Sequence, residues 1–448
     1  MMLKTYIEAF TLAAKAHGIG HLNFYTDISR SRSVSVYQGE LDKLELSEAC
    51  RLFIEGEVDG FSGEIYVENF ASEQIEEQIQ ILRESALAYQ RPFVSRPLTD
   101  MPGQETQQDF LPLDKVLVGM LAAERAANAD SRTQLQGCFF QEKYSDVTLT
   151  NGEGCTMTDR MGGAHSYLSL TARQEELVQL AGKSVPLPWG QFPDMEAMAD
   201  RVAADALARL HAGSYPTGAC PVVLAANVVC ELLDAFAPAF FAKNVYSHMS
   251  VLEGKLDQQV AGENITLLED PLLPGGLRPR RFDDEGTPTS AKTIVERGTL
   301  RTYLHNRKSA ADAGCAPGGN GFRPSVSEEA SAGYTNLLLQ SGEKSQDGLL
   351  ADMGDGLLIT GVSGVFAGAH PSSGEFSLIS HGYKIRQGVR QGAVSQITIA
   401  GSFFEMLRQV QGIGGDNEWM RASHGCVRAP SLYVSSLAVS GGADDEKK

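Results

Sequence analysis

Several features that would reveal a chemistry at once are missing from this sequence. No run of residues reaches the roughly 18 apolar positions that a membrane-spanning helix needs. No zinc-protease signature of the His-Glu-x-x-His type occurs, and of the nine histidines only His17 and His21 fall within five residues of each other. Because these two flank the glycines at the end of a predicted helix, we interpret them as surface residues. We therefore expect no membrane segment, and no metal site with ligands at short spacing.

Paired cysteines and positive charge are also scarce. The seven cysteines are odd in number and scattered, and none forms a Cys-x-x-Cys pair. This usage predicts reduced thiols and a cytoplasmic protein. Lys and Arg total 38 against 56 Asp and Glu, which gives a formal net charge of −18. A surface this acidic repels phosphate backbones, so we expect no general binding to nucleic acid.

What the sequence does contain is typical of a globular chain with two or three domains. It has 448 residues, 42% of them hydrophobic, and its 46 glycines predict many turns and short strands. Residues 212–218 form the best candidate boundary. The predicted fold class is α+β. It comprises an N-terminal α+β domain (1–212), a larger, mainly antiparallel β-rich domain (219–440) and a disordered tail (441–448).

Hydrophobic periodicity places the secondary structure. Helices are predicted over 4–17, 73–89, 113–129, 195–211 and 225–236. Thr171 and Gln174 form a capping-box pattern, which predicts a further helix through Leu180. The predicted strands are 21–26, 33–38, 41–48, 51–57, 60–67, 134–144, 145–150, 155–159 and 221–224, with short strands continuing to about residue 439.

Candidate chemical groups are few and isolated. His424-Gly425-Cys426 places two soft ligands around a turn, with no further ligand near in sequence. The glycine-dense loop 314–323 can cradle an anion or a peptide backbone, and Cys315 within it is a conceivable nucleophile beside His305. The acidic run 283–285 suits either a hard cation or pairing with the arginines before it. The residues alone leave these alternatives open, and plain turns explain each of them as well.

Taken in order, several segments resemble the TldD/PmbA family, whose members have been called modulators of DNA gyrase and microcin-processing peptidases. The resemblance runs from about residue 20 to residue 440 and begins at the strand and turn of 34–41. Its more specific segments are 250–256, 282–286, 294–300, 319–323, 373–377, 399–402 and 429–432. The fold implied by this resemblance is an N-terminal α+β domain followed by a larger antiparallel β domain.

Within that family the chain resembles the PmbA branch, also called TldE. In the TldD branch a His-Glu-x-x-x-His helix binds zinc, with a cysteine near the C-terminus as a further ligand. The equivalent helix here is 225–236, yet no histidine lies between His211 and His248. In the two registers that the flanking segments allow, the histidine positions hold other residues: Leu233 and Pro238, or Cys230 and Ala235 when Glu231 matches the catalytic glutamate. Because Cys426 alone would not hold a metal, we expect no metal or cofactor in this chain, and zinc in a partner subunit.

The resemblance implies the non-metal subunit of a peptidase, which pairs with a TldD-like zinc subunit and forms a homodimer in isolation. Its expected role is to bind unfolded or leader peptides as extended strands through main-chain hydrogen bonds. No residue is expected to be catalytic. The residues expected to line the substrate chamber are Asp283, Asp284, Glu285, Asn320 and Arg323.

Two other interpretations remain open at this point. One is a stand-alone regulatory or binding protein of the gyrase-modulator type, although the net charge of −18 argues against direct binding to DNA. The other is a metal-independent hydrolase that uses Cys315, Cys426 or a pair of acidic residues. The sequence does not decide whether the chain is an enzyme on its own.

Overall fold

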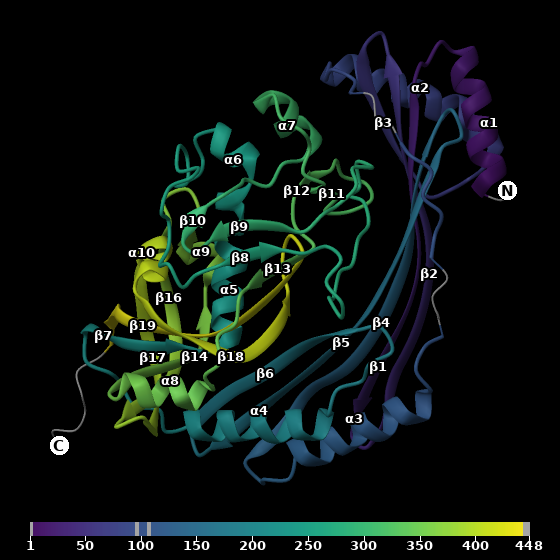
Figure 1. Ribbon diagram of the computed structural model, residues 1–448. Coiled ribbons are helices and arrows are strands. Elements are labelled where there is room, and N and C mark those ends of the chain that lie inside the picture. Colours follow the sequence, from purple (N-terminus) through teal and green to yellow (C-terminus); the bar gives the residue numbers. More distant parts are fainter. Residues whose placement is uncertain (1–2, 95–97, 105–108, 442–448) are drawn as a thin grey trace.

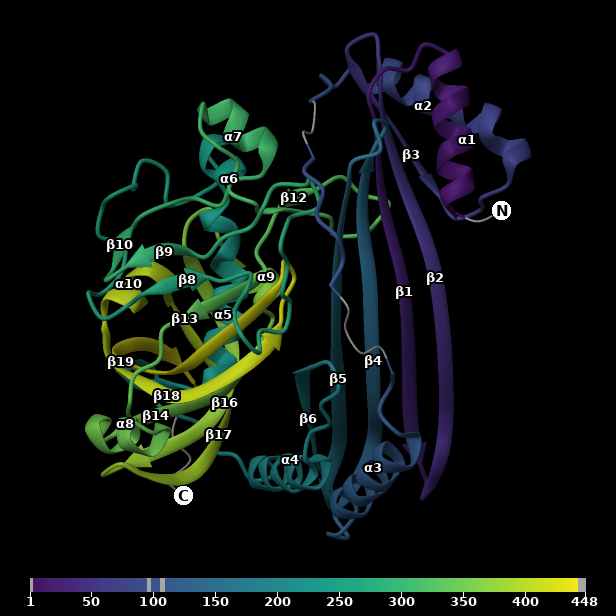
Figure 2. The same ribbon diagram turned by 45° about the vertical axis from the view of Figure 1, so that its right-hand side comes forward.

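The computed structural model describes residues 3–94, 98–104 and 109–441, which build two sheet-based units side by side (Figures 1 and 2). Helices and many strands occur together, as the α+β prediction requires. None of the helices in these ranges has the length and apolarity that crossing a bilayer requires. Apart from Gly441, the tail predicted at 441–448 lies outside the described residues.

The N-terminal unit is one antiparallel sheet of six long strands in the order β3-β2-β1-β4-β5-β6. The strands that the sequence predicted as separate short segments are continuous. Polar residues between two predicted segments, such as Asp27, Ser29 and Arg32, are buried in β1 and pair with β2 and β4 on either side. The strands are β1 (Leu22–Tyr37), β2 (Glu40–Val58), β3 (Phe61–Val67), β4 (Thr133–Asn151), β5 (Thr156–Gln174) and β6 (Leu177–Pro188).

Four helices cover the two ends of this sheet. Helices α1 (Leu3–Ala16) and α2 (Ile75–Tyr89) pack at one end, and α3 (Leu113–Ala127) and α4 (Met195–Arg209) pack at the other (Figure 1). All four were predicted to within a few residues.

Successive side chains of each strand point to opposite faces of the sheet, so the residues that pack against the helices are distinct from those on the other face. In β1 the buried Phe24 belongs to the core under α1 and α2, and Val34 belongs to the core with α3 and α4. The neighbouring Tyr25 instead packs with Phe282 of the C-terminal unit. One face of β1 therefore holds the helices, and the other meets the second unit.

The helix predicted from Thr171 to Leu180 is wrong, because this segment is a β-hairpin. Thr171 and Leu180 lie opposite each other on β5 and β6, and the chain turns at Glu175, whose φ is 53°. The capping-box pattern competed with a stronger signal, the period-2 burial of Leu168, Leu170 and Ala172.

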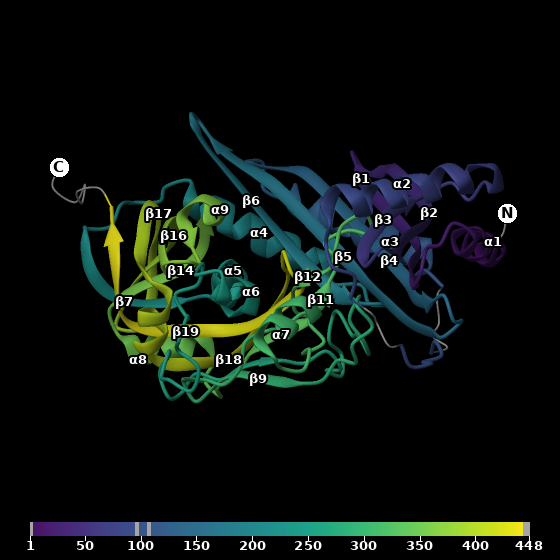
Figure 3. The ribbon, with the colours of Figure 1, turned by 90° about the horizontal axis from the view of Figure 1, so that it is seen from above.

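The C-terminal unit is an eleven-stranded mixed sheet that closes around one helix. Strand β7 (Gly218–Leu224) pairs with both β14 (Gly356–Ser363) and β19 (Cys426–Ser440). Together with β16 (Glu375–Arg386) and β17 (Val389–Ser402) these strands form a closed circuit. Seen from above, this circuit encloses α5 (Ala226–Phe236) (Figure 3).

Shorter elements complete this unit. The sheet continues beyond β19 through β13 (Asn336–Leu339), β8 (Leu267–Glu269), β9 (Lys292–Glu296) and β10 (Thr299–Leu300), while β15 (Ala369–His370) pairs with β16 and β18 (Val410–Arg421) with β19. A separate hairpin joins β11 (Gly321–Phe322) and β12 (Ser331–Ala332). The remaining helices are α6 (Ala242–Tyr246), α7 (Arg307–Ala313), α8 (Gln346–Met353), α9 (Val365–Gly368) and α10 (Phe403–Arg408), with single 3₁₀ turns at Ser72–Gln74 and Ala237–Phe240.

One loop of the C-terminal unit fixes it against the sheet of the N-terminal unit. Phe282 is fully buried among Phe53, Val147 and other apolar side chains of that sheet. Beside it, the Arg281 Nε lies 3.1 Å from the Asp159 carboxylate on β5, and the Arg281 main-chain N–H donates to the same group over 2.7 Å. Apolar burial and a charge-assisted contact thus hold the two units in one orientation.

Candidate functional site

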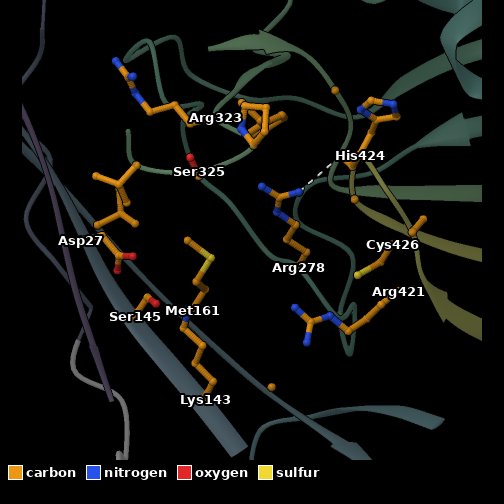
Figure 4. A pocket seen from close by; sticks show the side chains of 18 of the residues that line it. Asp27, Lys143, Ser145, Met161, Arg278, Arg323, Ser325, Arg421, His424 and Cys426 are labelled. Atoms are coloured by element: carbon orange, nitrogen blue, oxygen red, sulfur yellow. Dashed lines mark hydrogen bonds between the residues drawn. The ribbon is translucent and has the colours of Figure 1, made fainter. Parts of the chain in front are cut away.

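A cavity with a volume of about 760 Å³ lies between the two units (Figure 4). One side is the face of the N-terminal sheet that carries no helices. The other side is made by three C-terminal segments around residues 277–278, 322–333 and 421–426. We call this cavity the cleft.

The sheet side of the cleft is built by alternate residues of neighbouring strands. Tyr25 and Asp27 face it from β1, and Lys143 and Ser145 face it from β4. From β5 come Met161 and the two glycines that follow it. β6 pairs with β5 only from Gly163 onward. At residues 160–162, beside the cleft, β5 therefore pairs with β4 alone among the described strands, and its other edge is open.

The opposite side is anchored to helix α5. The Asp234 carboxylate of that helix accepts hydrogen bonds from the Tyr334 hydroxyl over 2.8 Å and from the main chain and hydroxyl of Ser423 over 3.0–3.1 Å. Gly425 packs so closely that an added Cβ would lie 2.3 Å from the Tyr334 carbonyl oxygen. Glycine is therefore required between His424 and Cys426, and the motif seen in the sequence is a packed turn.

Arg278 belongs to this C-terminal side, and no carboxylate among the described residues forms an ion pair with it. Its guanidinium donates to the His424 carbonyl oxygen over 3.3 Å and lies 5.0 Å from the centre of the Phe322 ring. Burial, together with the neighbouring charge of Arg280, lowers the pKa of Arg278. An anion bound in the cleft would favour the charged guanidinium and would therefore oppose this lowering of the pKa of Arg278.

Four of the five residues predicted to line a substrate chamber lie outside the cleft lining. Asp283, Asp284 and Asn320 are 0–2% exposed, and Glu285 is 7% exposed. Arg323 lines the cleft with part of its surface, and its guanidinium lies 3.9 Å from the centre of the Phe53 ring. The structure thus brings all five into one loop cluster, of which Arg323 alone reaches the cavity.

The acidic residues of this cluster organise the main chain. The Asp283 carboxylate accepts from the N–H groups of Glu285, Thr287 and Gly321 over 2.8–3.0 Å. Burial and the nearby Glu285 raise the pKa of Asp283 to about 7, although these hydrogen bonds oppose the shift.

Asp284 makes a second set of bonds, to Arg280 and to the main chain of Arg323, over 2.7 and 2.8 Å. Burial is the largest single influence and would raise the pKa of Asp284, but the charge of Arg280 and the hydrogen bonds from Arg323 and Arg280 together hold that pKa below its usual value. Asp284 is therefore ionised, and its bonds to Arg280 and to the main chain of Arg323 hold the loop in place.

The groups on α5 do not suit a zinc ion. The Cys230 thiol is buried and donates to the Glu418 carbonyl oxygen over 3.4 Å, and burial raises its pKa to about 12. Burial also raises the pKa of Glu231 to about 7, and Asp234 already serves donors of the protein. Zinc prefers deprotonated thiols, neutral imidazoles and free carboxylates that converge on one point. In the described ranges, no group of three or more His, Cys, Asp and Glu side chains is placed to hold a metal ion.

The cysteines considered as nucleophiles have different surroundings. Cys426 lines the cleft but is 6% exposed, and burial raises its pKa, which keeps the thiol protonated and weakly nucleophilic. Cys315 is exposed, and its Sγ lies 3.8 Å from the His305 Nδ1. This pair lies apart from the residues that line the cleft.

Sequence reasoning missed most of the cleft. Lys143 and Arg421 face it from opposite sides, as Figure 4 shows, and they are separated by more than half of the chain. A lone lysine in an alternating strand carries no local signal of function. Only the packing of the two units brings it near Arg278 and Arg421.

Comparison with known proteins identifies the C-terminal unit. The family described as the PmbA/TldA metallopeptidase C-terminal domain matches residues 217–441, just over half of the chain. A protein of Methanothermobacter thermautotrophicus named "Metalloprotease" is 25% identical over 327 residues, which cover 72% of this chain and 69% of that protein.

Solved structures share the whole arrangement. A protein of Thermotoga maritima described as a modulator of a DNA gyrase superposes with a TM-score of 0.86 and 27% identity, over 98% of this chain and all of that one. TldE from Thermococcus kodakarensis superposes with a TM-score of 0.84 over 97% of this chain and all of its own. At 21% identity this second likeness concerns the fold. The common fold includes both units.

Proposed function

The chain belongs to the PmbA/TldD family, and we propose that it is the non-metal subunit of a peptidase of this kind, in which it holds unfolded or leader peptides for a zinc-bearing partner. One observation carries the proposal. A cavity of about 760 Å³ is bordered by a loop that Asp234 of α5 anchors, and the polar groups of that helix are engaged by the protein or kept protonated. The chain thus has room for a peptide but no set of ligands for zinc on α5.

The open edge of β5 supports the manner of binding. At 160–162 the strand lacks a β6 neighbour, and Gly162 and Gly163 line the cleft beside it. An extended peptide placed there would add main-chain hydrogen bonds to a sheet edge, a mode of binding that depends little on side chains. This matches a subunit that accepts peptides of varied sequence.

A second open edge supports assembly with another subunit. β3 pairs with β2 only over Leu52–Val58, so residues 40–51 of β2 have a strand on one side only, within the described part of the chain. This edge exposes Leu44 and Leu46, with 43% and 68% of their surfaces accessible. Long open edges with apolar side chains tend to pair with other chains. We assign this edge to contact with a second copy or with the TldD-like partner.

The free thiols support a reducing environment. All seven cysteines are unpaired, and such usage fits the cytoplasm. A cytoplasmic location is therefore part of the proposal.

The decisive experiment combines metal analysis with reconstitution. Purified chain, analysed by plasma mass spectrometry, is expected to contain far less than one zinc per chain and to leave an unfolded peptide intact. Addition of a relative with the His-Glu-x-x-x-His helix is expected to start cleavage, and chelation of zinc to stop it. Chelator-sensitive cleavage by this chain alone would refute the proposal. Cleavage that resists chelation but is lost on alkylation of thiols would favour the cysteine hydrolase instead.

A further inference from the structure

The charge inside the cleft is opposite to the charge of the whole chain. Of its thirty described lining residues five are Arg or Lys and one is an acid. The chain as a whole carries a net charge of −18. The cations are Arg51, Lys143, Arg278, Arg323 and Arg421, and the acid is Asp27. Such a local excess in a narrow space concentrates the positive potential there.

Two of these cations are already engaged by the protein. The Arg51 guanidinium lies 3.8 Å from the Asp27 carboxylate, and 3.7 Å from that of Glu68. Arg323 donates to the Glu328 carbonyl oxygen, and its guanidinium lies 3.9 Å from the centre of the Phe53 ring. Both side chains therefore form part of the wall.

The other three cations lack a carboxylate partner among the described residues. Lys143 and Arg421 are exposed to the cleft, and neither takes part in an ion pair there. Arg278 donates only to the His424 carbonyl oxygen, a neutral acceptor, over 3.3 Å. Because unpaired cations in a confined site favour an anion, this set points to a ligand with negative charge.

The three cations act on the same region from two sides. The charges of Arg278 and Arg421 both lower the pKa of the Cys426 thiol, against the larger effect of burial that raises it. Figure 4 shows Lys143 extending from the sheet and Arg421 from the facing wall toward the space between them. A chain in extended conformation that runs along β5 would pass between these side chains.

We propose that the cleft selects acidic peptide segments, with Asp or Glu side chains bound by Lys143 on the sheet side and by Arg278 and Arg421 on the opposite side. This inference rests on the proposed function, since it names the class of peptide that the cleft holds. The open edge of β5 binds the main chain irrespective of sequence, and the three cations add a preference for carboxylates.

A peptide suits the cleft better than a nucleic acid does. The net charge of −18 repels a phosphate polymer, which is charged at every nucleotide, more strongly than a peptide with a few isolated carboxylates. Within the cleft, apolar side chains such as Met161, Val326 and Leu187 line the walls between the cations. A peptide that carries separated Asp or Glu residues among apolar ones matches this arrangement of cations and apolar side chains.

Calorimetric titration of the full chain with matched peptides tests the inference. Two end-capped peptides of ten residues are compared, which differ at only four positions. The acidic peptide has Asp or Glu at these positions, and the neutral peptide has Asn or Gln. The acidic peptide is expected to bind about tenfold more tightly, and the advantage is expected to shrink as salt is raised. Lys143→Gln and Arg421→Gln are each expected to weaken its binding roughly three- to tenfold and to leave the neutral peptide unaffected.

The control variant is Lys115→Gln, which removes one exposed positive charge on α3, away from the cleft. Equal affinity for the two peptides would overturn the charge preference and leave the proposed function standing. Failure of both peptides to bind would overturn the preference and peptide holding together. Tighter binding of a ten-nucleotide oligothymidylate than of the acidic peptide would assign the cations to phosphate and refute the inference. Circular dichroism of each variant shows that the fold is retained.

Discussion

At the scale of single residues, the acidic cluster at 283–285 shows how polar density in a sequence can indicate architecture. Asp283 is fully buried and binds three main-chain N–H groups. The sequence located the cluster. It could not reveal that the carboxylates bind main chain within the loop cluster, because two of the donors, Gly321 and Arg323, lie 38 and 39 residues further along the chain.

Asp283→Ala is expected to destabilise the protein by about 3 kcal/mol, since the buried main-chain N–H groups that lose their acceptor remain unsatisfied. The thermal midpoint would fall by several degrees. The control is Asp312→Ala, which removes an exposed carboxylate on α7. If Asp283→Ala weakened peptide binding without lowering the midpoint, the structural role would be contradicted.

Glu231 on α5 gives a prediction about pH. Its pKa is about 7 in the folded chain against 4.5 for the free side chain, with burial as the main cause. The unfolded chain therefore loses this proton at lower pH than the folded chain does. The contribution to stability is complete below about pH 4.5 and is lost as the pH rises to 7.

Glu231→Gln removes this loss and is expected to stabilise the protein at pH 8 by up to about 3 kcal/mol, with little change at pH 4.5. Thermal midpoints at both pH values provide the measurement. Glu176→Gln, at the exposed turn between β5 and β6, is the matched control. A stabilisation of the same size at both pH values would contradict the burial of a protonated carboxyl group.

At the scale of elements, hydrophobic periodicity predicted the long helices well and the strands only in pieces. Helices α2 to α5 have strong periodic patterns and were predicted within two residues at most of their ends. The strands of the N-terminal sheet run through buried and exposed environments in turn, so their polar central parts looked like breaks. In the predicted helix at 171–180, cross-strand pairing between β5 and β6 overrode a local capping pattern.

The open edge of β2 leads to a prediction about assembly. Leu44→Ser combined with Leu46→Ser removes exposed apolar surface from that edge and is expected to raise the dissociation constant of the proposed homodimer at least tenfold. Light scattering coupled to gel filtration measures the mass as a function of concentration. Leu12→Ser, at a side chain 75% exposed on α1, is the control. If the double substitution changes the dissociation constant no more than the control does, this edge is not the interface.

At the scale of the whole molecule, the cleft exists because two independent sheets are fixed at one angle. Its residues come from strands and loops distant in the sequence, which is why local patterns indicated Arg323 and missed Lys143 and Arg421. The resemblance to a family indicated the architecture. The charge of the cleft follows only from the packing of the two units.

Phe282 is the side chain whose loss is expected to loosen that packing. Phe282→Ala leaves a cavity among the apolar residues of the sheet and is expected to cost about 3–5 kcal/mol. Small-angle scattering is expected to show a larger radius of gyration, as the two units gain freedom. Phe366→Ala, at a fully exposed phenylalanine, is the control. An unchanged scattering curve for Phe282→Ala would show that other contacts hold the units together.

The most direct test of the central claim is the affinity of this chain for a peptide before and after metal is stripped from it. If the chain holds peptides through a strand edge and cationic side chains, the calorimetric dissociation constant for the acidic peptide will be the same in excess EDTA as without it, within twofold. Loss of binding in EDTA, restored by one equivalent of zinc, would show that a metal in this chain holds the substrate, and would contradict the account.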